Sequence, residues 1–183
     1  MSEIHFSADQ HFNSDRTLKY SRRPFGSVGE MNRAIIQNIN ALPKGATLYS
    51  LGDWGEMEYI SAVREDIAVR LVMGNWDDHF QRESGMTLED WCKHWKAKGF
   101  DEIYPGPVTL GLESGSIWLC HKPSERHTTL FNAFGHIHRA SLVKRNGVNV
   151  GVDQHSYKPI SVDDFLFWKE AVQKHFDDEE WMA

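Results

Sequence analysis

The sequence predicts an α/β fold with additional strands in the second half of the chain. Short apolar runs alternate with segments of helical periodicity in the first half, as expected for an α/β protein. Two pairs of apolar runs joined by turn residues, typical of hairpins, come later. Polar residues follow directly after several predicted strands. A chain of 183 residues is long enough for a sizeable core, so we expect one domain over residues 1–183.

The first half is predicted to alternate strands and helices. Helix 28–42 is indicated by apolar residues at helical spacing, and Pro43 and Gly45 end it. Thr87 is a suitable N-cap for a later helix, with Asp90 three positions on. The expected elements are strand 4–8, loop 12–27, helix 28–42, strand 46–51, short helix 57–66, strand 67–73 and helix 87–98.

The second half is predicted to consist of strands followed by one helix. Glu113, Ser114 and Gly115 separate two apolar runs and predict a hairpin. The pair Asn146-Gly147 suits the positive-φ positions of a second tight turn. The expected elements are strands 108–112, 116–120, 130–134, 141–145 and 148–152, then helix 162–176, with a frayed acidic tail.

Composition excludes some classes of function. The net charge of −6 gives no overall basic field for gripping long nucleic acid through many phosphates, although it leaves room for a local basic patch. No apolar run approaches the ~20 residues of a membrane span, and no signal peptide precedes the first strand. Cys92 and Cys120 are expected to be buried thiols without a disulfide. We therefore expect a cytoplasmic globular protein; the sequence specifies no oligomeric state.

Polar side chains follow the predicted strands at the points where those strands end. The pairs Asp-x-His and His-x-His each place two donors on one face of an extended segment. Sites in α/β sheets gather at the carboxyl ends of strands. Mixed nitrogen and oxygen ligands favour Mn²⁺, Fe, Zn²⁺ or Ni²⁺ over a pure Mg²⁺ site. The predicted metal ligands are Asp9, His11, Asp53, Asn75, His121, His136 and His138.

These motifs, in this order, resemble those of the calcineurin-like metallophosphoesterase superfamily. The matching segments are Asp9-Gln10-His11, Gly52-Asp53, Gly74-Asn75-Trp76-Asp77, His121 and Gly135-His136-Ile137-His138, which span most of the chain. A subgroup of small bacterial and phage members is also similar in Arg23-Pro24-Phe25, Glu30-Met31-Asn32 and residues 149–153 and 157–161.

The resemblance implies a four-layer α+β fold, with two mixed β-sheets packed as a sandwich and flanked by helices. It also implies two divalent cations, with Mn²⁺ the first choice and Fe, Zn²⁺ or Ni²⁺ as alternatives. One cation would be held by Asp9, His11, Asp53 and His138, and the other by Asp53, Asn75, His121 and His136. The implied reaction is hydrolysis of a phosphoester by a metal-activated hydroxide.

The sequence departs from the family pattern at Trp76, where the family usually has a histidine that supports the leaving group. Indole cannot donate a titratable proton at neutral pH. Asp77 keeps its place in the motif, so we count it with Asp53 and Asn75 among the catalytic candidates. Three explanations stay open: the enzyme prefers good leaving groups, His79 takes over the role, or the chain is a binding module.

Substrate contacts are predicted beside the ligand motifs. Trp54 and Trp76 could stack on a nucleobase, or could instead pack against the loops around the metals. Arg22 or Arg23 could hold a substrate phosphate bidentately, and Arg23 is the stronger catalytic candidate.

The sequence therefore predicts a dinuclear-metal phosphodiesterase or phosphatase acting on a small, nucleotide-like phosphoester. A metal-dependent nuclease is one alternative, and a basic groove leading to the metals would support it. A non-catalytic metal-binding scaffold on the same fold is the other, and an exposed apolar patch beside an occluded site would support that.

Overall fold

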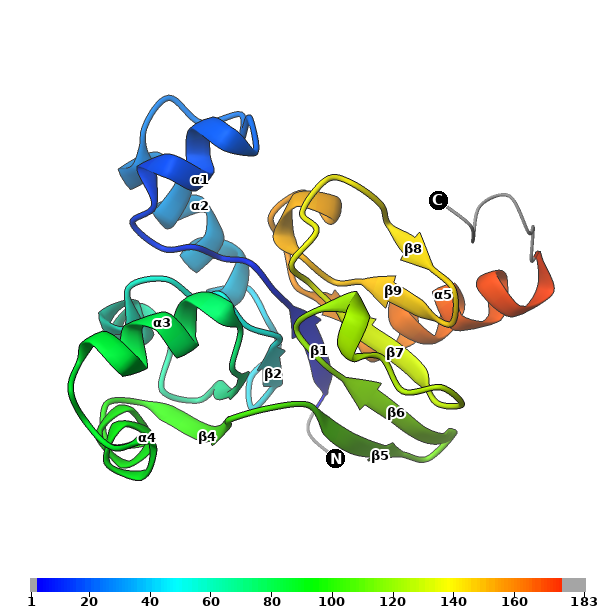
Figure 1. Ribbon diagram of the computed structural model, residues 1–183. Coiled ribbons are helices and arrows are strands. Elements are labelled where there is room, and N and C mark those ends of the chain that lie inside the picture. The colour runs from blue at the N-terminus through cyan, green and yellow to red at the C-terminus, as the bar shows by residue number, and fades with distance from the viewer. Residues whose placement is uncertain (1–2, 176–183) are drawn as a thin grey trace.

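The computed structural model describes residues 3–175 of the chain. Figure 1 shows the course of the chain through two β-sheets and the helices around them. The strands are β1 (Ile4–Ser7), β2 (Thr47–Ser50), β3 (Ala68–Val72), β4 (Phe100–Tyr104), β5 (Val108–Leu112), β6 (Gly115–Leu119), β7 (Phe131–Phe134), β8 (Val143–Lys144), β9 (Gly147–Asn149) and β10 (Ile160–Ser161). The α-helices are α1 (Asp15–Tyr20), α2 (Val28–Asn40), α3 (Asn75–Glu83), α4 (Leu88–Lys96) and α5 (Val162–Lys174), with 3₁₀ turns at Met57–Ala62, Pro123–Glu125 and Val152–Gln154.

Each of the two sheets has five strands and is mixed. The first has the order β10-β1-β2-β3-β4, in which only β10 runs antiparallel to its neighbour. The second has the order β5-β6-β7-β9-β8, with a parallel centre of β6, β7 and β9 between antiparallel edges. The predicted sandwich of two mixed sheets flanked by helices is confirmed.

The two sheets share one hydrophobic cluster. Phe6 and Tyr49 of the first sheet and Leu119 of the second are buried in it. Phe165 of α5 joins the sheets, since its ring lies 5.2 Å from that of Phe6 and 5.5 Å from that of Phe131. Burial of such apolar surface contributes about 25 cal/mol per Å², so the apolar residues of the strands explain why the two sheets pack together.

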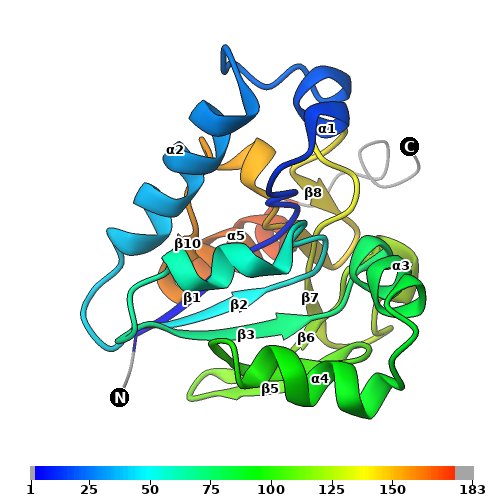
Figure 2. The ribbon, with the colours of Figure 1, turned by 90° about the vertical axis from the view of Figure 1, so that its left-hand side faces the viewer.

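A second cluster covers the other face of the first sheet. Met31 and Ile35 of α2, Trp91 of α4 and Leu48 of β2 belong to it. In Figure 2, α2 lies above and α4 below the parallel strands β1, β2 and β3, which are visible between the two helices. This packing explains the helical spacing of apolar residues in α2, because residues at that spacing lie on the one face of the helix that contacts the sheet.

Four helices and strands were not predicted, namely α1, α3, β4 and β10, and neither were the 3₁₀ turns at Pro123–Glu125 and Val152–Gln154. Helix α1 lies inside the expected loop, where the Ser14 hydroxyl accepts a hydrogen bond from the backbone N–H of Thr17. Helix α3 has Asp77 as its buried residue and so offers no apolar stripe to read. Strand β4 lies at the sheet edge, and its pairing with β3 shifts register between Val69 and Arg70.

The turn between β8 and β9 was predicted one residue too late. Lys144 pairs with Gly147, so Arg145 and Asn146 form the turn and only Asn146 has a positive φ of 61°. Gly147 is instead needed within β9, because a Cβ there would lie 2.9 Å from the carbonyl oxygen of Asn132.

Other expectations concern the remaining cap, the cysteines and the end of the chain. The predicted cap of α4 is confirmed, since the Thr87 hydroxyl accepts from the N–H of Asp90 at 3.2 Å. Cys92 and Cys120 are free thiols, as predicted; Cys120 is buried, but Cys92 is only half-buried. The acidic tail after residue 175 lies outside the described residues. Among residues 3–175 no helix combines the length and apolar character needed to cross a bilayer.

Candidate metal centre

The predicted ligands lie at the carboxyl ends of strands from both sheets. Asp9 and Asp53 follow β1 and β2, and Asn75 opens α3 after β3. His121 and His136 follow the parallel strands β6 and β7 of the second sheet. Because the parallel strands of each sheet point the same way, their loops can meet in one place.

The ligand loops are held side by side by backbone hydrogen bonds. The N–H of Asp9 donates to Gly52 O at 3.0 Å, and that of His11 donates to Asp53 O at 2.9 Å. Gly52 has a φ of +87°, and a Cβ on it would lie 2.6 Å from the backbone of Gly74. Glycine at position 52 therefore permits the close approach of the second and third ligand loops.

Several ligands have left-handed backbone, which costs roughly 1–3 kcal/mol each for a residue other than glycine. Such strain persists only where the surrounding structure fixes it, and it gathers at functional sites. The residues and their φ values are Asp9 at 58°, His11 at 50°, Asp53 at 56°, His136 at 71° and His138 at 47°.

The side chains gather in two groups of three, each with ligand atoms within 4.8 Å of one another. The first group is Asp9, His11 and His138, and the second is Asp53, His121 and His136.

Asp53 belongs to the second group and lies between its other members and the first group. Its Oδ2 is 3.5 Å from Nε2 of His11 and 3.4 Å from Nε2 of His121. The amide oxygen of Asn75 lies 3.1 Å from Nε2 of His121. All the predicted ligands therefore lie close together, and the carboxylate of Asp53 is positioned where it could contact two ions.

The chemistry of His11 fits a metal ligand. Its Nε2 is buried and has no hydrogen-bond partner. A buried nitrogen without a partner is rare in folded proteins, and a cation would satisfy it. Burial lowers the pKa of His11 to about 3, which keeps the ring neutral and able to donate a lone pair.

The charges around the site also favour a cation. Burial raises the pKa of Asp9 to about 6, against the attraction of His121 and His138. Burial alone would lower the pKa of His121, but its hydrogen bond to Asp53 and the charge of that carboxylate raise it to about 9. A cation bound at this place would compete with a proton for Nε2 of His121.

Hydrogen bonds to the other ring nitrogens orient two of the histidines. Nδ1 of His121 donates to Leu51 O at 2.8 Å, which leaves Nε2 facing Asp53 and Asn75. Nδ1 of His138 lies 2.7 Å from Oδ2 of Asp153. Such contacts fix the tautomer of a ligating histidine and raise its basicity.

The Arg23 side chain is buried in an ion pair and does not line the depression over the ligands, so it is not placed to hold a substrate phosphate as predicted. Its side chain and that of Asp153 are both 0% exposed and form an ion pair at 2.8 Å. The guanidinium also donates to the carbonyls of Asp9 at 2.6 Å and Gln10 at 2.8 Å. Arg23 therefore holds the first ligand loop and, through Asp153, orients His138.

Asp77 is a positioning residue and does not face the site. It is fully buried. Its carboxylate accepts backbone N–H groups from Gly74 at 2.7 Å, Asp53 at 2.8 Å and Trp54 at 3.1 Å. These bonds tie the loop that carries Asp53 to the start of α3, which carries Asn75. Asp77 was predicted as catalytic, and the structure corrects that prediction.

Three other predicted contacts lie away from the ligand atoms. Trp54 is 0% exposed and packs in the core, with its ring 4.9 Å from that of Phe12, so it offers no stacking surface. Arg22 is exposed with a φ of 48° and is not among the described residues that line the site. His79 packs against Trp76 and lies 3.5 Å from Glu83, instead of reaching the metal ligands.

A depression of about 190 Å³ opens above the two groups of ligands. Trp76 of α3 forms part of its wall, and its contact with a substrate stays a prediction. Arg16 and Tyr20 of α1 form another part, and the Arg16 guanidinium lies 5.7 Å from the centre of the Trp76 ring. Arg16 was not predicted as a site residue, because residues 12–27 were expected to form a loop. Ser14, a favourable N-cap residue, could have indicated the helix that carries Arg16.

Comparisons with known proteins support the fold and leave the activity open. No family model matches the chain. The chain is 27% identical over 172 residues to the uncharacterized protein MJ1445 of Methanocaldococcus jannaschii, covering 89% of each chain. It is similar to the crystal structure of AQ665, a protein of unknown function from Aquifex aeolicus, with a TM-score of 0.68 and 21% identity. That match covers 92% of this chain and 100% of the other. The second similarity shows that the fold also occurs in a solved structure.

Proposed function

We propose that this protein is a phosphoesterase of the calcineurin-like metallophosphoesterase type that uses two divalent cations. The observation that carries the proposal is the position of Asp53 between two groups of metal-ligating side chains. The unpaired Nε2 of His11 and the strained backbone of the ligand loops support it. The proposed enzyme is cytoplasmic, and Mn²⁺ is the first candidate for both ions.

The residues of the chain divide the work of binding and orientation. Two bound cations would polarise the phosphoryl group and provide a nucleophile from water at neutral pH. Arg16 on one side can hold non-bridging phosphate oxygens through charge-assisted hydrogen bonds. Lys122 can do the same from an adjoining depression of about 150 Å³ that Asn75 and His121 also line.

The substrate is proposed to be a small phosphodiester or phosphomonoester, with a nucleotide-like compound as one candidate. A depression of about 190 Å³ is below the ~300–1,000 Å³ that is usual for drug-sized ligands. The net charge of −6 also favours a small substrate over a long nucleic acid. Trp76 lies in the wall, where its ring can contact the group attached to the phosphate.

The proposal is tested by stripping the protein of metal and adding back Mn²⁺, Ni²⁺, Zn²⁺ or Mg²⁺. We expect two ions bound per chain and hydrolysis of bis-p-nitrophenyl or p-nitrophenyl phosphate only after metal is restored. The preferred ester distinguishes a diesterase from a phosphatase. Two bound ions without turnover on either ester would instead favour the metal-binding scaffold, for which Trp76 in place of a proton donor is the supporting observation.

Trp76→His is expected to speed hydrolysis of esters with poor leaving groups. The wild-type wall offers an indole N–H, which cannot deliver a proton to an alkoxide, whereas imidazole can, typically for a gain of about 10²-fold or more. We expect a smaller gain with p-nitrophenyl phosphate, whose leaving group needs no acid. The measurement is the ratio of kcat for phenyl and p-nitrophenyl phosphate in both proteins, with Trp76→Phe as the matched control. An unchanged ratio in Trp76→His would show that the ring does not face the leaving group.

A further inference from the structure

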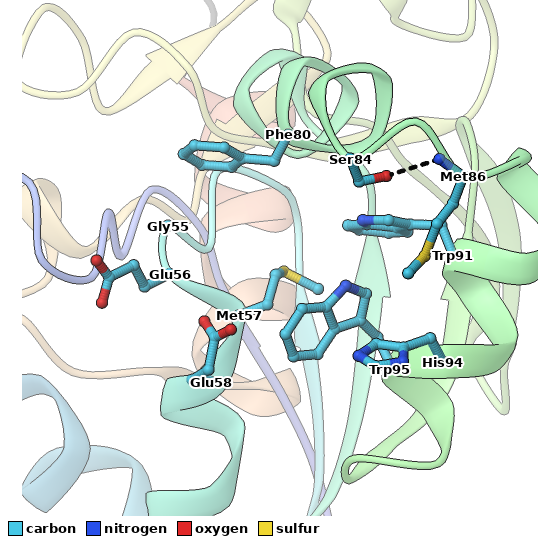
Figure 3. A pocket seen from close by; sticks show the side chains of 10 residues that line it. All are labelled: Gly55, Glu56, Met57, Glu58, Phe80, Ser84, Met86, Trp91, His94 and Trp95. Atoms are coloured by element: carbon cyan, nitrogen blue, oxygen red, sulfur yellow. Dashed lines mark hydrogen bonds between the residues drawn. The ribbon is translucent and has the colours of Figure 1, made fainter.

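A second pocket lies beside the candidate metal centre, between α3, α4 and the segment after β2. Its volume is about 220 Å³. Figure 3 shows Met57, Phe80, Trp91 and Trp95 around a common space, with the carboxylate of Glu56 turned away from it. The lining residues are Gly55, Glu56, Met57, Glu58, Phe80, Ser84, Met86, Trp91, His94 and Trp95.

The walls are aromatic and partly open to solvent. Trp91 is 2% exposed and Met57 is 4% exposed, so both belong to the core beneath the pocket. Phe80 is 36% exposed and Met86 is 41% exposed, although apolar side chains of this size usually gain by burial. Trp95 completes the wall from α4. The faces of such rings carry partial negative charge.

The charged side chains of the pocket are acidic. Glu56 and Glu58 lie together on one side of the space, opposite Trp91 (Figure 3). Oε1 of Glu56 accepts a hydrogen bond at 2.6 Å from Nδ2 of Asn13, which lies outside the lining, so Glu58 is the carboxylate nearer the space. The lining contains no lysine or arginine, and His94 is its one basic side chain. The pocket therefore repels anions and attracts cations.

We propose that this pocket binds a small organic cation, an alkylated ammonium group. Aromatic faces attract such a group through cation–π interactions, and two nearby carboxylates add to that attraction. A pocket of about 220 Å³ accommodates a small cation, although it is below the usual range for drug-sized ligands. A neutral apolar ligand would gain nothing from the carboxylates, so the charge of the pocket identifies the class of ligand.

The pocket adjoins the metal centre and is separate from it. Phe80 follows Trp76 by four residues on α3, which is about 6 Å along the helix axis. Trp76 lines the depression over the metal ligands, and Phe80 lines the second pocket. Gly55 packs against the backbone of His11 and Phe12, since a Cβ there would lie 2.2 Å from Phe12 N. Cation binding requires none of the metal ligands.

The test is a titration of the full chain with choline, with and without Mn²⁺, followed by the indole N–H signals of Trp91 and Trp95 in NMR spectra. The matched ligand is the neutral isostere of choline, in which carbon replaces nitrogen. We expect saturable shifts with choline in both metal states and binding of the isostere that is weaker by roughly fivefold or more.

Two variants test the parts of the pocket. Glu58→Gln removes an exposed carboxylate, and Phe80→Leu removes a ring while keeping apolar volume. Each is expected to weaken choline binding by roughly threefold or more, while Glu113→Gln in the β5–β6 turn leaves it unchanged. Thermal unfolding checks that the variants are folded.

The outcomes that overturn the proposal are equally specific. Equal affinity for choline and its isostere would identify an apolar pocket without cation selectivity. No shift with choline would show that this cation does not bind there. Tighter binding of adenosine than of choline would identify a site for a nucleobase. Each result contradicts cation binding without bearing on the metal-dependent reaction, which uses other residues.

Discussion

Asp53→Asn is expected to lower metal-dependent hydrolysis by roughly a thousandfold or more. In the structure, Oδ2 of Asp53 lies within 3.5 Å of histidines from both ligand groups. An amide at this position is neutral, so it stabilises two adjacent cations far less than a carboxylate does. A loss of several kcal/mol of charge stabilisation converts to this reduction in rate, because each ~1.4 kcal/mol is tenfold.

Metal content separates this effect from a simple loss of substrate binding. We expect Asp53→Asn to retain fewer than two ions per chain after dialysis against Mn²⁺, measured by atomic emission. Asp101→Asn is the matched control, since its carboxylate is 45% exposed and pairs with Arg70 outside the site. Two retained ions and near-normal turnover in Asp53→Asn would show that this carboxylate does not join the two metal sites.

The positions of the predicted metal ligands Asp9, Asp53 and Asn75 could be inferred from the sequence because they depend on the order of strands. Asp9, Asp53 and Asn75 each follow a strand of a parallel array, and parallel strands bring their carboxyl ends together. The prediction needed only the apolar runs and the turn glycines that end them. It did not need the rotamer of any side chain or the path of any loop.

The contacts around the ligands could not be predicted, because they depend on the conformations of loops. Arg22 and Arg23 are adjacent and identical in type. Arg22 has a left-handed backbone with a φ of 48° and is exposed, and Arg23 is buried. Nothing local in the sequence distinguishes them, because the partner of Arg23 is Asp153, 130 residues later.

The burial of Trp54 also could not be predicted from the neighbouring residues in the sequence, because it depends on how distant segments pack. It follows Asp53 directly, so a role at the site was a reasonable hypothesis. The bridge between Phe12 and Gly55, however, draws this segment against the first ligand loop. The Trp54 ring consequently packs between Phe12 and Phe100. A large apolar side chain beside a polar site was better explained by burial in the core.

Arg23→Met is expected to lower the free energy of unfolding by roughly 3–5 kcal/mol, the usual cost of leaving one partner of a buried ion pair alone. Both side chains are 0% exposed, so solvent does not screen the remaining charge on Asp153. Burial alone would raise the pKa of Asp153, but hydrogen bonds from His138 and Arg23 lower it, so the carboxylate is ionised at neutral pH. The measurement is urea unfolding of metal-free protein at neutral pH.

Arg22→Met provides the matched control, because its side chain is exposed and its loss should change stability by less than about 0.5 kcal/mol. Adding Asp153→Asn to Arg23→Met should restore part of the lost stability, since it removes a buried charge that has lost Arg23 and keeps only His138 as a partner. If Arg23→Met unfolds like the wild type but has a raised KM, the guanidinium instead contacts the substrate phosphate.

Because the ion pair also orients His138 through Asp153, Arg23→Met is also expected to weaken metal binding by about 10–100-fold. Loss of stability together with loss of metal affinity would therefore identify Arg23 as the residue that connects the folding of the first ligand loop to the assembly of the site.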